Sequence, residues 1–160
     1  MVVLGIDPGV VSTGYGLLSV AGGQPQVLDY GVITLESKLD LPSRLQRVYQ
    51  GLAEICGQHH PQAMSIEDLF YNKNVRTAMT VGHVRGAIIL AGMHHGLTVH
   101  TYTPLQIKQA VTGYGRAEKE QLQRMLKLIF KLSVIPEPDH AADALAAAYC
   151  HLNYARAPYL

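Results

Sequence analysis

Two acidic residues, Asp7 and Glu67, each follow directly on a short run of apolar, β-favouring residues. The runs are residues 2–6 and residues 63–66. A strand that is apolar along its length is typically buried on both faces. An ionised carboxylate at the end of such a strand must be paired, hydrogen-bonded or bound to a cation. The two positions together therefore predict a metal-binding site.

A third group of polar residues opens an alanine-rich segment near the end of the chain, where Pro138 is followed by Asp139, His140 and Asp143. The three-residue spacing of His140 and Asp143 places both on one face of a helix. Asp139 stands where a helix N-cap is expected. We therefore predict a functional role for Asp143 and a capping role for Asp139.

Carboxylate oxygens are the ligands that Mg²⁺ prefers, and open coordination positions allow phosphate oxygens to complete its shell. Nuclease sites of this kind hold two ions about 3.5–4 Å apart, one that activates water and one that stabilises the leaving 3′ oxygen. Asp7 would be the shared ligand. The imidazole of His140 is a softer ligand that suits Mn²⁺ better than Mg²⁺. Proton transfer, or a structural histidine at a helix start, is the alternative for His140.

The middle of the chain is basic although the net charge is only +1, because no Asp or Glu occurs over residues 69–117. Its cationic and titratable residues are Lys73, Arg76, Arg85, Lys108 and Arg116, with His83, His94, His95 and His100. A basic region beside an acidic site suits a polyanion that is held by its phosphates. The alternative is that helices in this stretch have solvated basic faces.

The length of 160 residues and a hydrophobic content of 48% favour one domain over residues 1–160. No apolar run approaches the roughly 20 residues of a membrane span, and the N-terminal residues lack a signal-peptide pattern. We therefore expect a cytoplasmic protein without membrane association. Cys56 and Cys150 are far apart in sequence and are expected to be reduced thiols.

Hydrophobic periodicity and turn residues predict three strands followed by alternating helices and strands. The strands are expected near residues 2–7, 14–20, 26–35, 62–67 and 97–102. The helices are expected over residues 45–56, 75–93, 104–111 and 122–129, and after Pro138. This order predicts an α/β fold with a mixed five-stranded sheet flanked by helices. With the first strand central and the strand of Glu67 beside it, the two carboxylates would emerge side by side.

A series of short motifs, in order along nearly the whole chain, resembles the bacterial RuvC family of Holliday junction resolvases. The motifs are Gly5-Ile6-Asp7-Pro8-Gly9, Thr13-Gly14-Tyr15-Gly16, Leu41-Pro42-Ser43-Arg44-Leu45, Ile66-Glu67, Lys73-Asn74, Gly82, Arg85-Gly86, Lys108-Gln109, Ala117-Glu118-Lys119 and Ala141-Ala142-Asp143-Ala144-Leu145-Ala146. The resemblance implies a ribonuclease H-like fold, a homodimer, and metal-dependent nicking of two strands of like polarity at a four-way DNA junction. It also implies a branch-migration motor as a partner.

Position by position, the resemblance assigns Asp7, Glu67 and Asp143 to the metal-binding carboxylates of the family. The fourth family position falls on His140, where many members have aspartate and some have histidine. An alignment shifted by one residue would assign that position to Asp139 instead. The resemblance also implies two Mg²⁺ ions per site when substrate is bound, with Mn²⁺ able to substitute.

The expected DNA-binding residues combine this resemblance with the basic middle of the chain. Lys108 and Lys119 match family lysines that lie near the scissile phosphate and the DNA backbone. Phe70 matches an aromatic residue that stacks on bases at the opened junction centre, with a core phenylalanine as the alternative. Lys73 and Arg76 complete the predicted set.

Two other functions share parts of this pattern. An Asp-x-Gly start followed by Thr and Gly also resembles sugar-kinase and actin-like nucleotide-binding folds, which usually need two domains. A noncatalytic nucleic-acid-binding relative is the second alternative. For the expected homodimer, Gly82 and Gly86 lie on one face of the helix over residues 75–93 and permit close approach of a second backbone. That face could equally pack on the sheet.

Overall fold

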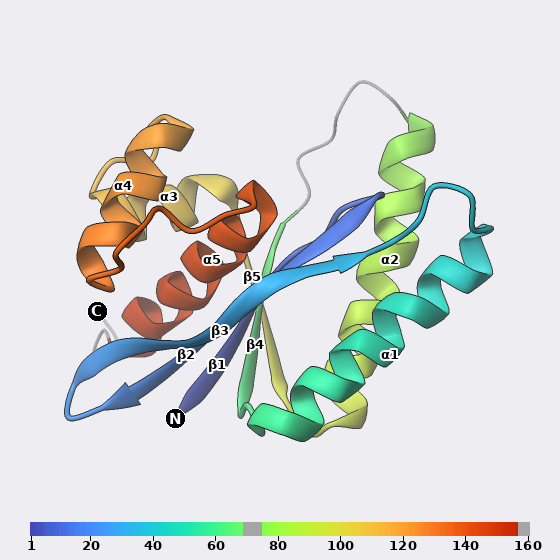
Figure 1. Ribbon diagram of the computed structural model, residues 1–160, viewed down its shortest axis with the longest axis horizontal. Helices are drawn as coiled ribbons and strands as arrows, with labels where there is room; N and C mark the ends of the chain where they lie inside the picture. The colour runs from blue at the N-terminus through green and yellow to red at the C-terminus, as the bar shows by residue number, and fades with distance from the viewer. Residues whose placement is uncertain (69–74, 157–160) are drawn as a thin grey trace.

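The computed structural model describes residues 1–68 and 75–156 and contains five strands and five helices in that part of the chain. Their order and bounds are β1 (Val2–Asp7), β2 (Ser12–Ala21), β3 (Gln24–Thr34), α1 (Leu41–His59), β4 (Ala63–Glu67), α2 (Val75–His94), β5 (Thr98–Tyr102), α3 (Pro104–Thr112), α4 (Lys119–Ile129) and α5 (Asp139–Arg156). Figure 1 shows the sheet between two groups of helices, with α1 and α2 on one side and α3, α4 and α5 on the other.

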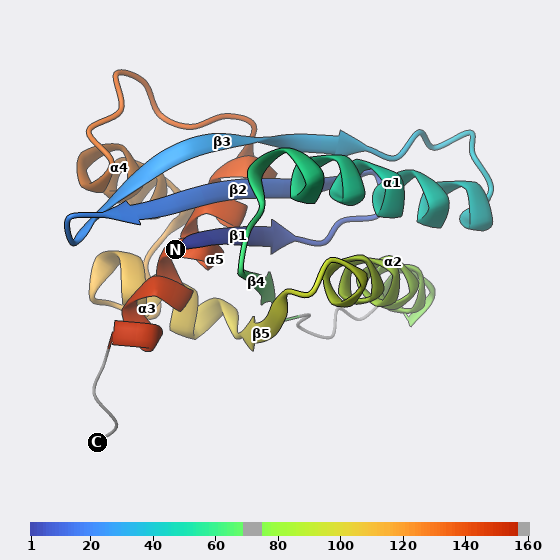
Figure 2. The same ribbon diagram turned by 90° about the horizontal axis from the view of Figure 1, so that it is seen from below.

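The strands form one mixed sheet in the order β3-β2-β1-β4-β5, so β1 is central. β1, β2 and β3 pair as an antiparallel meander, whereas β4 runs parallel to both β1 and β5. Figure 2 shows the same succession of strands from below. The predicted meander, the central first strand and its neighbour that ends in Glu67 are confirmed.

Side-chain alternation along β1 and β4 divides their residues between the two faces of the sheet. The positions buried under α1 and α2 are Leu4, Ile6, Met64 and Ile66. The intervening positions turn to α5, where Val3 and Ala63 pack with Leu145 and Ala148. By the same alternation Asp7 and Glu67 project from the face that α5 covers.

Helix α5 lies unusually close to the sheet because β1 and β2 present glycines beneath it. A Cβ atom on Gly5 would overlap the carbonyl oxygen of Ala144, and one on Gly14 would overlap the carbonyl oxygen of His140. The Ser65 hydroxyl on β4 donates a buried hydrogen bond of 2.6 Å to the carbonyl oxygen of Ala147. These contacts fix the position of the first turns of α5 over the ends of the strands.

Helix ends and strand lengths differ in detail from the sequence-based expectation. α1 begins at Leu41 rather than near residue 45, because Asp40 acts as its N-cap and accepts a hydrogen bond of 2.9 Å from the Ser43 amide. β2 and β3 pair as far as the Ala21↔Gln24 register, with a shift of register between Leu17 and Leu18, so both are longer than predicted. The predicted start of α3 is confirmed, since Thr103 and Gln106 form a reciprocal capping box.

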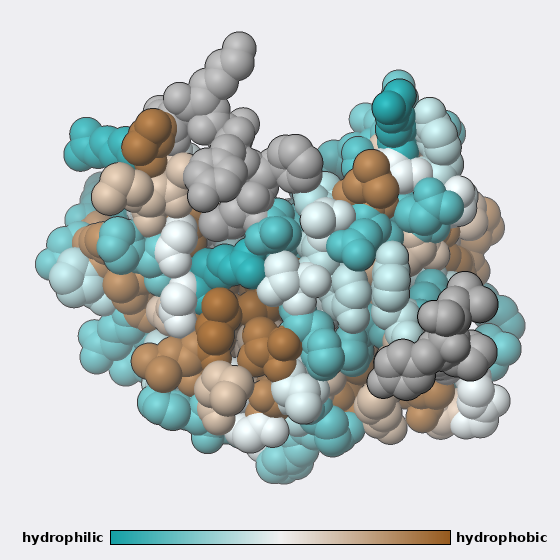
Figure 3. All heavy atoms as spheres, turned by 180° about the vertical axis from the view of Figure 1, so that it is seen from behind, coloured by the Kyte–Doolittle hydropathy of each residue, from teal (hydrophilic) through white to brown (hydrophobic). Residues whose placement is uncertain are grey.

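The face of α2 that carries Gly82 and Gly86 is its outward face, and it is apolar. Val75, Met79, Leu90 and Met93 are between 51% and 72% exposed, whereas α2 packs inward through other residues such as Val84 and Ile88. A Cβ atom on Gly82 or Gly86 would meet no atom within 4 Å. The alternative that the glycine face packs on the sheet is therefore wrong. Figure 3 shows apolar residues gathered on the side of the molecule that α2 forms.

Two other expectations concern the membrane and the thiols. Within residues 1–68 and 75–156, no helix combines the length and apolar character that a bilayer crossing requires. Cys56 and Cys150 are both buried free thiols, as predicted. Burial raises the pKa of Cys56 to about 11 and that of Cys150 to about 12, so neither thiol is activated.

Replacing Gly14 with alanine tests the close approach of α5. The added methyl group would displace the first turn of α5, and we expect Gly14→Ala to lower the free energy of unfolding by about 1–3 kcal/mol. Gly57→Ala is the control, because a Cβ atom at this position in α1 meets no atom within 4 Å and alanine favours helix. Urea denaturation followed by circular dichroism would measure both; equal losses would contradict the role of Gly14.

Candidate active site

The carboxylates of Asp7 and Glu67 lie at the same edge of the sheet. Asp7 ends β1 and Glu67 ends β4, and the parallel register pairs the residues before them, Ile6 and Ile66. The Asp7 side chain is only 13% exposed. The pKa of Glu67 is raised to about 8, first by burial and then by the negative charges of Asp7 and Asp143. The edge predicted from sequence therefore carries closely interacting carboxylates.

Asp143 joins this group from the second turn of α5. Its side chain is 28% exposed, and burial raises its pKa against the opposing effect of the Lys119 ammonium. The charge of Asp7 raises it further. The structure thus brings Asp7, Glu67 and Asp143 together from residues far apart in the chain.

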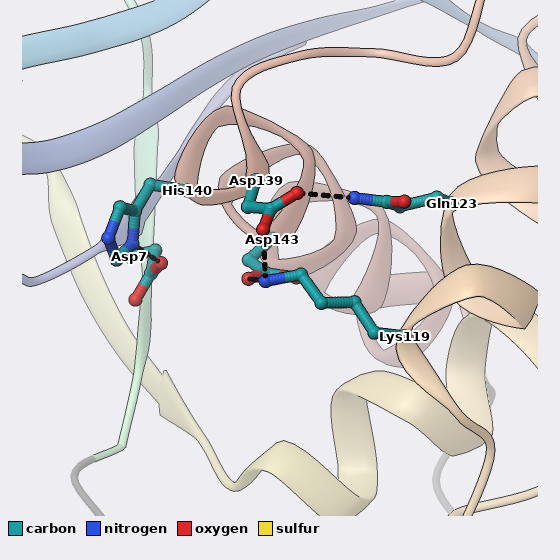
Figure 4. A network of polar contacts seen from close by, with 6 residues as sticks. All are labelled: Asp7, Lys119, Gln123, Asp139, His140 and Asp143. Carbon is teal, nitrogen blue, oxygen red and sulfur yellow. Dashed lines mark hydrogen bonds and ion pairs between the residues drawn. The ribbon is translucent and has the colours of Figure 1, made fainter.

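The side chain of His140 contacts the Asp7 carboxylate directly. Its Nδ1 donates a hydrogen bond of 2.6 Å to Asp7 Oδ2, and this bond is the main reason why the pKa of His140 is raised. The charges of Asp7 and Asp143 add to the effect, whereas burial opposes it. Figure 4 shows the His140 ring beside Asp7, one turn before Asp143 on the same helix. Asp7 is therefore bonded to His140, and its charge acts on both Glu67 and Asp143.

The donor set of this cluster fits a hard divalent cation. Burial and repulsion between Asp7, Glu67 and Asp143 raise the pKa of Glu67 to about 8, and a bound cation would relieve that repulsion. As the side chains lie, Asp7 bonds to His140 and Asp143 pairs with Lys119. Among the residues that the structure describes, no three potential ligands yet converge on a common point. Binding a cation would therefore require these side chains to rotate.

Asp139 does not belong to the carboxylate cluster. Its Oδ1 accepts a hydrogen bond of 2.8 Å from Gln123 Nε2, and its Oδ2 lies 3.0 Å from Lys119 Nζ. Figure 4 shows the Asp139 carboxylate turned to α4 and away from Asp7. The predicted N-cap role is wrong, because Asp139 is the first residue of the helix and its carboxylate is engaged by another element. The shifted alignment receives no support from this geometry.

The predicted DNA-binding residues fall in different parts of the molecule. Lys108, on α3, lies close enough to Glu67 for its charge to lower the Glu67 pKa slightly against the dominant raising effects. Lys119 is the first residue of α4 and reaches Asp143 at 3.6 Å. Arg76 is exposed in the first turn of α2. Phe70 and Lys73 lie outside the described residues.

One supporting pair was missed by the sequence reasoning. The sequence places Arg85 among the basic residues that could bind a polyanion. In the structure it instead donates a 2.6 Å hydrogen bond to Asp68 and a 2.9 Å hydrogen bond to Thr101 Oγ1. Asp68 directly follows Glu67, and its amide donates to the Tyr102 carbonyl at 2.8 Å. Arg85 therefore anchors the chain where β4 ends. The available signal was Asp68, the last acid before the acid-free stretch.

A mixed five-stranded sheet whose first and fourth strands end in carboxylates, with a third carboxylate on the last helix, defines a nuclease of the ribonuclease H-like class. The family model for crossover junction endodeoxyribonuclease RuvC matches residues 3–151. The chain belongs to this RuvC family, and the resemblance drawn from its motifs is confirmed.

Individual relatives agree with this assignment. RuvC of Desulforamulus reducens is 49% identical over 154 residues, which are 96% of this chain and 94% of that protein. RuvC of Alkaliphilus metalliredigens is 49% identical over 153 residues, 96% of this chain and 93% of that protein. A Thermus thermophilus RuvC structure in complex with a Holliday junction substrate matches with a TM-score of 0.93 and 36% identity, and the match covers 98% of this chain and 95% of that one.

A more distant structure shares the fold alone. The yeast mitochondrial Holliday junction resolvase Ydc2 matches with a TM-score of 0.68 at 13% identity, and the match covers 95% of this chain and 78% of that chain. The expected ribonuclease H-like sheet is thus confirmed at both levels of similarity.

The raised pKa of Glu67 predicts a pH-dependent stability in the absence of metal. A carboxyl whose folded-state pKa, about 8, exceeds its unfolded value favours the folded state at low pH, and this contribution is lost as pH rises toward 8. Glu67→Gln cannot ionise, so its Tm relative to the wild type should rise over this interval by at least about 2–4 °C, as expected for about 1 kcal/mol in a chain of this size.

Thermal melts in chelator from about pH 5 to pH 9 would measure this difference. Glu36→Gln, which removes an exposed carboxyl after β3, is the control and should not diverge from the wild type. Added Mg²⁺ should stabilise the wild type more than Glu67→Gln. A constant difference between wild type and Glu67→Gln at all pH values would contradict the raised pKa.

Proposed function

We propose that this protein resolves four-way DNA junctions by paired, symmetric nicks, using divalent metal to hydrolyse a phosphodiester bond in each of two strands. The observation that carries the proposal is the cluster of Asp7, Glu67 and Asp143, in which burial and then repulsion between the carboxylates raise the Glu67 pKa to about 8. Repulsion between buried carboxylates does not stabilise the fold, but it favours the binding of a cation. Membership in the RuvC family supports junction DNA as the substrate.

The proposed metal ligands are the carboxylates of Asp7, Glu67 and Asp143, with Asp7 shared. Two bound Mg²⁺ ions would supply an activated water and stabilise the leaving 3′ oxygen, and Mn²⁺ can substitute because it accepts the same oxygen ligands. The strands β1 and β4 hold two of these carboxylates on rigid backbone at one sheet edge. Asp143 is held on α5, which the glycines of β1 and β2 keep close to that edge.

His140 is proposed as the fourth member of the site, acting through Nε2. Its Nδ1–H is committed to Asp7, which fixes the orientation of the ring and leaves Nε2 as the free ring nitrogen. Nε2 can either bind metal, when the imidazole is neutral, or deliver a proton, when it is charged. The raised pKa of His140 supports the second role in the absence of metal.

Phosphate contacts are proposed for Lys108 and Lys119, because both ammonium groups flank the carboxylates from α3 and α4. Such contacts position the DNA backbone but carry no sequence information. Arg76 would extend the basic surface along the start of α2. Two further contacts are proposed for residues outside the described part of the chain. Lys73 would bind phosphate, and Phe70 would stack on bases at the junction centre.

A homodimer through α2 is part of the proposal. Val75, Met79, Leu90 and Met93 are exposed along one side of this helix, and Gly82 and Gly86 between them leave open space for a second backbone. Two nicks related by near two-fold symmetry require two sites related in the same way, which a closed dimer supplies. Three further statements are proposals as well. They are a single domain over residues 1–160, a branch-migration motor as a partner and a cytoplasmic location.

Cleavage of synthetic substrates tests the catalytic proposal and its alternatives. The protein would be incubated with a four-way junction, a linear duplex or ATP, each with Mg²⁺ or Mn²⁺. We expect symmetric nicks in the junction, and a loss of at least about 100-fold in Asp7→Asn and Asp143→Asn with junction binding retained, because a neutral amide replaces an anionic metal ligand. Asp29→Asn, which changes a carboxylate bonded to Tyr15 on the α1 side of the sheet, is the matched control.

The alternatives predict different results in the same assay. Junction binding without cuts would favour a noncatalytic nucleic-acid-binding protein. Hydrolysis of ATP alone would favour a kinase-like or actin-like activity. Either result would contradict the resolvase proposal.

Sedimentation tests the proposed dimer. A lysine within the apolar stripe of α2 would have to be desolvated in the interface, so we expect Met79→Lys to weaken the dimer toward the 17.5 kDa species. Leu128→Lys, at a 69% exposed position on α4, is the matched control and should leave the dimer intact. A wild-type protein that sediments only at 17.5 kDa at working concentration would contradict the proposal.

A further inference from the structure

One carboxylate, that of Asp139, ties the first turns of α4 and α5 together. Its two oxygens have different partners, Gln123 Nε2 at 2.8 Å and Lys119 Nζ at 3.0 Å. Lys119 and Gln123 are four residues apart on α4 and therefore lie on one face of that helix. The Asp139 carboxylate thus holds a two-point contact with α4 beside the candidate active site, as Figure 4 shows.

The Lys119 ammonium is shared between Asp139 and a proposed metal ligand. It lies 3.0 Å from Asp139 Oδ2 and 3.6 Å from Asp143 Oδ2, so the shorter contact is to the carboxylate outside the site. Asp139 is 62% exposed, whereas Asp143 is 28% exposed. Because an ion pair is stronger where water is displaced, Lys119 released from Asp139 would move onto Asp143.

Such a move would have two effects on the site. The ammonium would occupy a carboxylate oxygen of Asp143 that a divalent cation needs as a ligand. It would also leave the rim of the site, where it is placed to contact a phosphate. Asp139 opposes both effects, since its charge draws Lys119 outward while Gln123 fixes the direction of the Asp139 carboxylate.

We infer that Asp139 is a positioning residue for the proposed cleavage: it holds the Lys119 ammonium at the rim of the site and off the metal-binding oxygens of Asp143. This inference rests on the proposed nuclease function. The Asp139 carboxylate itself contacts α4 and points away from Asp7. A purely structural role is the competing explanation, and an exposed pair of this kind contributes only about 0.2–1 kcal/mol to stability.

A double-mutant cycle between Asp139 and Lys119 tests the inference. Asp139→Asn keeps an oxygen for Gln123 but loses the charge that holds Lys119, and Lys119→Met removes the ammonium. In single-turnover cleavage of a four-way junction, we expect Asp139→Asn to be about fivefold slower, the effect of a displaced positioning charge. It should add nothing to Lys119→Met, because effects transmitted through one group are not additive. Asp139→Glu should restore most of the rate.

The Mg²⁺ requirement supplies a second readout. In Asp139→Asn the Mg²⁺ concentration for half-maximal cleavage should rise, since the released ammonium competes at Asp143, and it should return to the wild-type value in the double variant. Glu120→Gln is the matched control, because it removes an exposed negative charge next to Lys119 without breaking the Asp139 contact. Circular dichroism melts should show all variants folded.

A readout without catalysis separates this inference from the proposed function. In the ¹⁵N NMR spectrum of lysine-labelled protein without metal, the Lys119 ammonium signal should shift in Asp139→Asn and stay in place in Glu120→Gln. An unchanged signal in Asp139→Asn would overturn the inference, as would an equal slowing by Asp139→Asn with and without Lys119. If the wild type cuts no junction, the proposed function fails, and the NMR comparison alone decides whether Asp139 positions Lys119.

Discussion

The site depends on how closely α5 lies on the sheet. At Gly5 and Gly14 the strands bring backbone against backbone, and a single methyl group at either position would overlap a carbonyl oxygen of the helix. The alanines of α5 complete this contact, with Ser65 bonding to the carbonyl of Ala147. Two carboxylates on strands and one on a helix can interact only if the two layers are held at this short separation. Small residues therefore determine where the charged ones meet.

The acidic charges at the site are partly balanced by a histidine and a lysine from two different helices. Asp7 and Glu67 are fixed by the backbone of β1 and β4, whereas the basic partners of Asp7 and Asp143, His140 and Lys119, are side chains at helix starts. Because Glu67 is buried beside other acids, its pKa is raised to about 8. The arrangement costs stability in the metal-free protein, and the same repulsion increases the gain from binding a cation.

The sequence was most informative where a local pattern and the tertiary structure agree. Asp7 and Glu67 could be predicted because each ends an apolar run, and the order of strands and helices placed them on neighbouring parallel strands. The outward face of α2 could not be predicted, since Val75, Met79 and Met93 form the same apolar stripe whether a helix faces the sheet or a second chain. Asp139 was misread for a related reason. Its position after Pro138 is a strong capping signal, but its real partners, Lys119 and Gln123, are brought to it by packing of α4 on α5.

The order of the strands also has a consequence for how the chain folds. Asp7 reaches Glu67 only when β1 pairs with β4, and β2, β3 and α1 separate these two strands in the sequence. Asp143 joins them only when α5 docks on the sheet. Contacts between residues so far apart in sequence form late, because loop closure must be overcome first. No early or partly folded chain would therefore carry a complete set of acids. A chain in which α5 has not docked on the sheet would lack the third acid of the site.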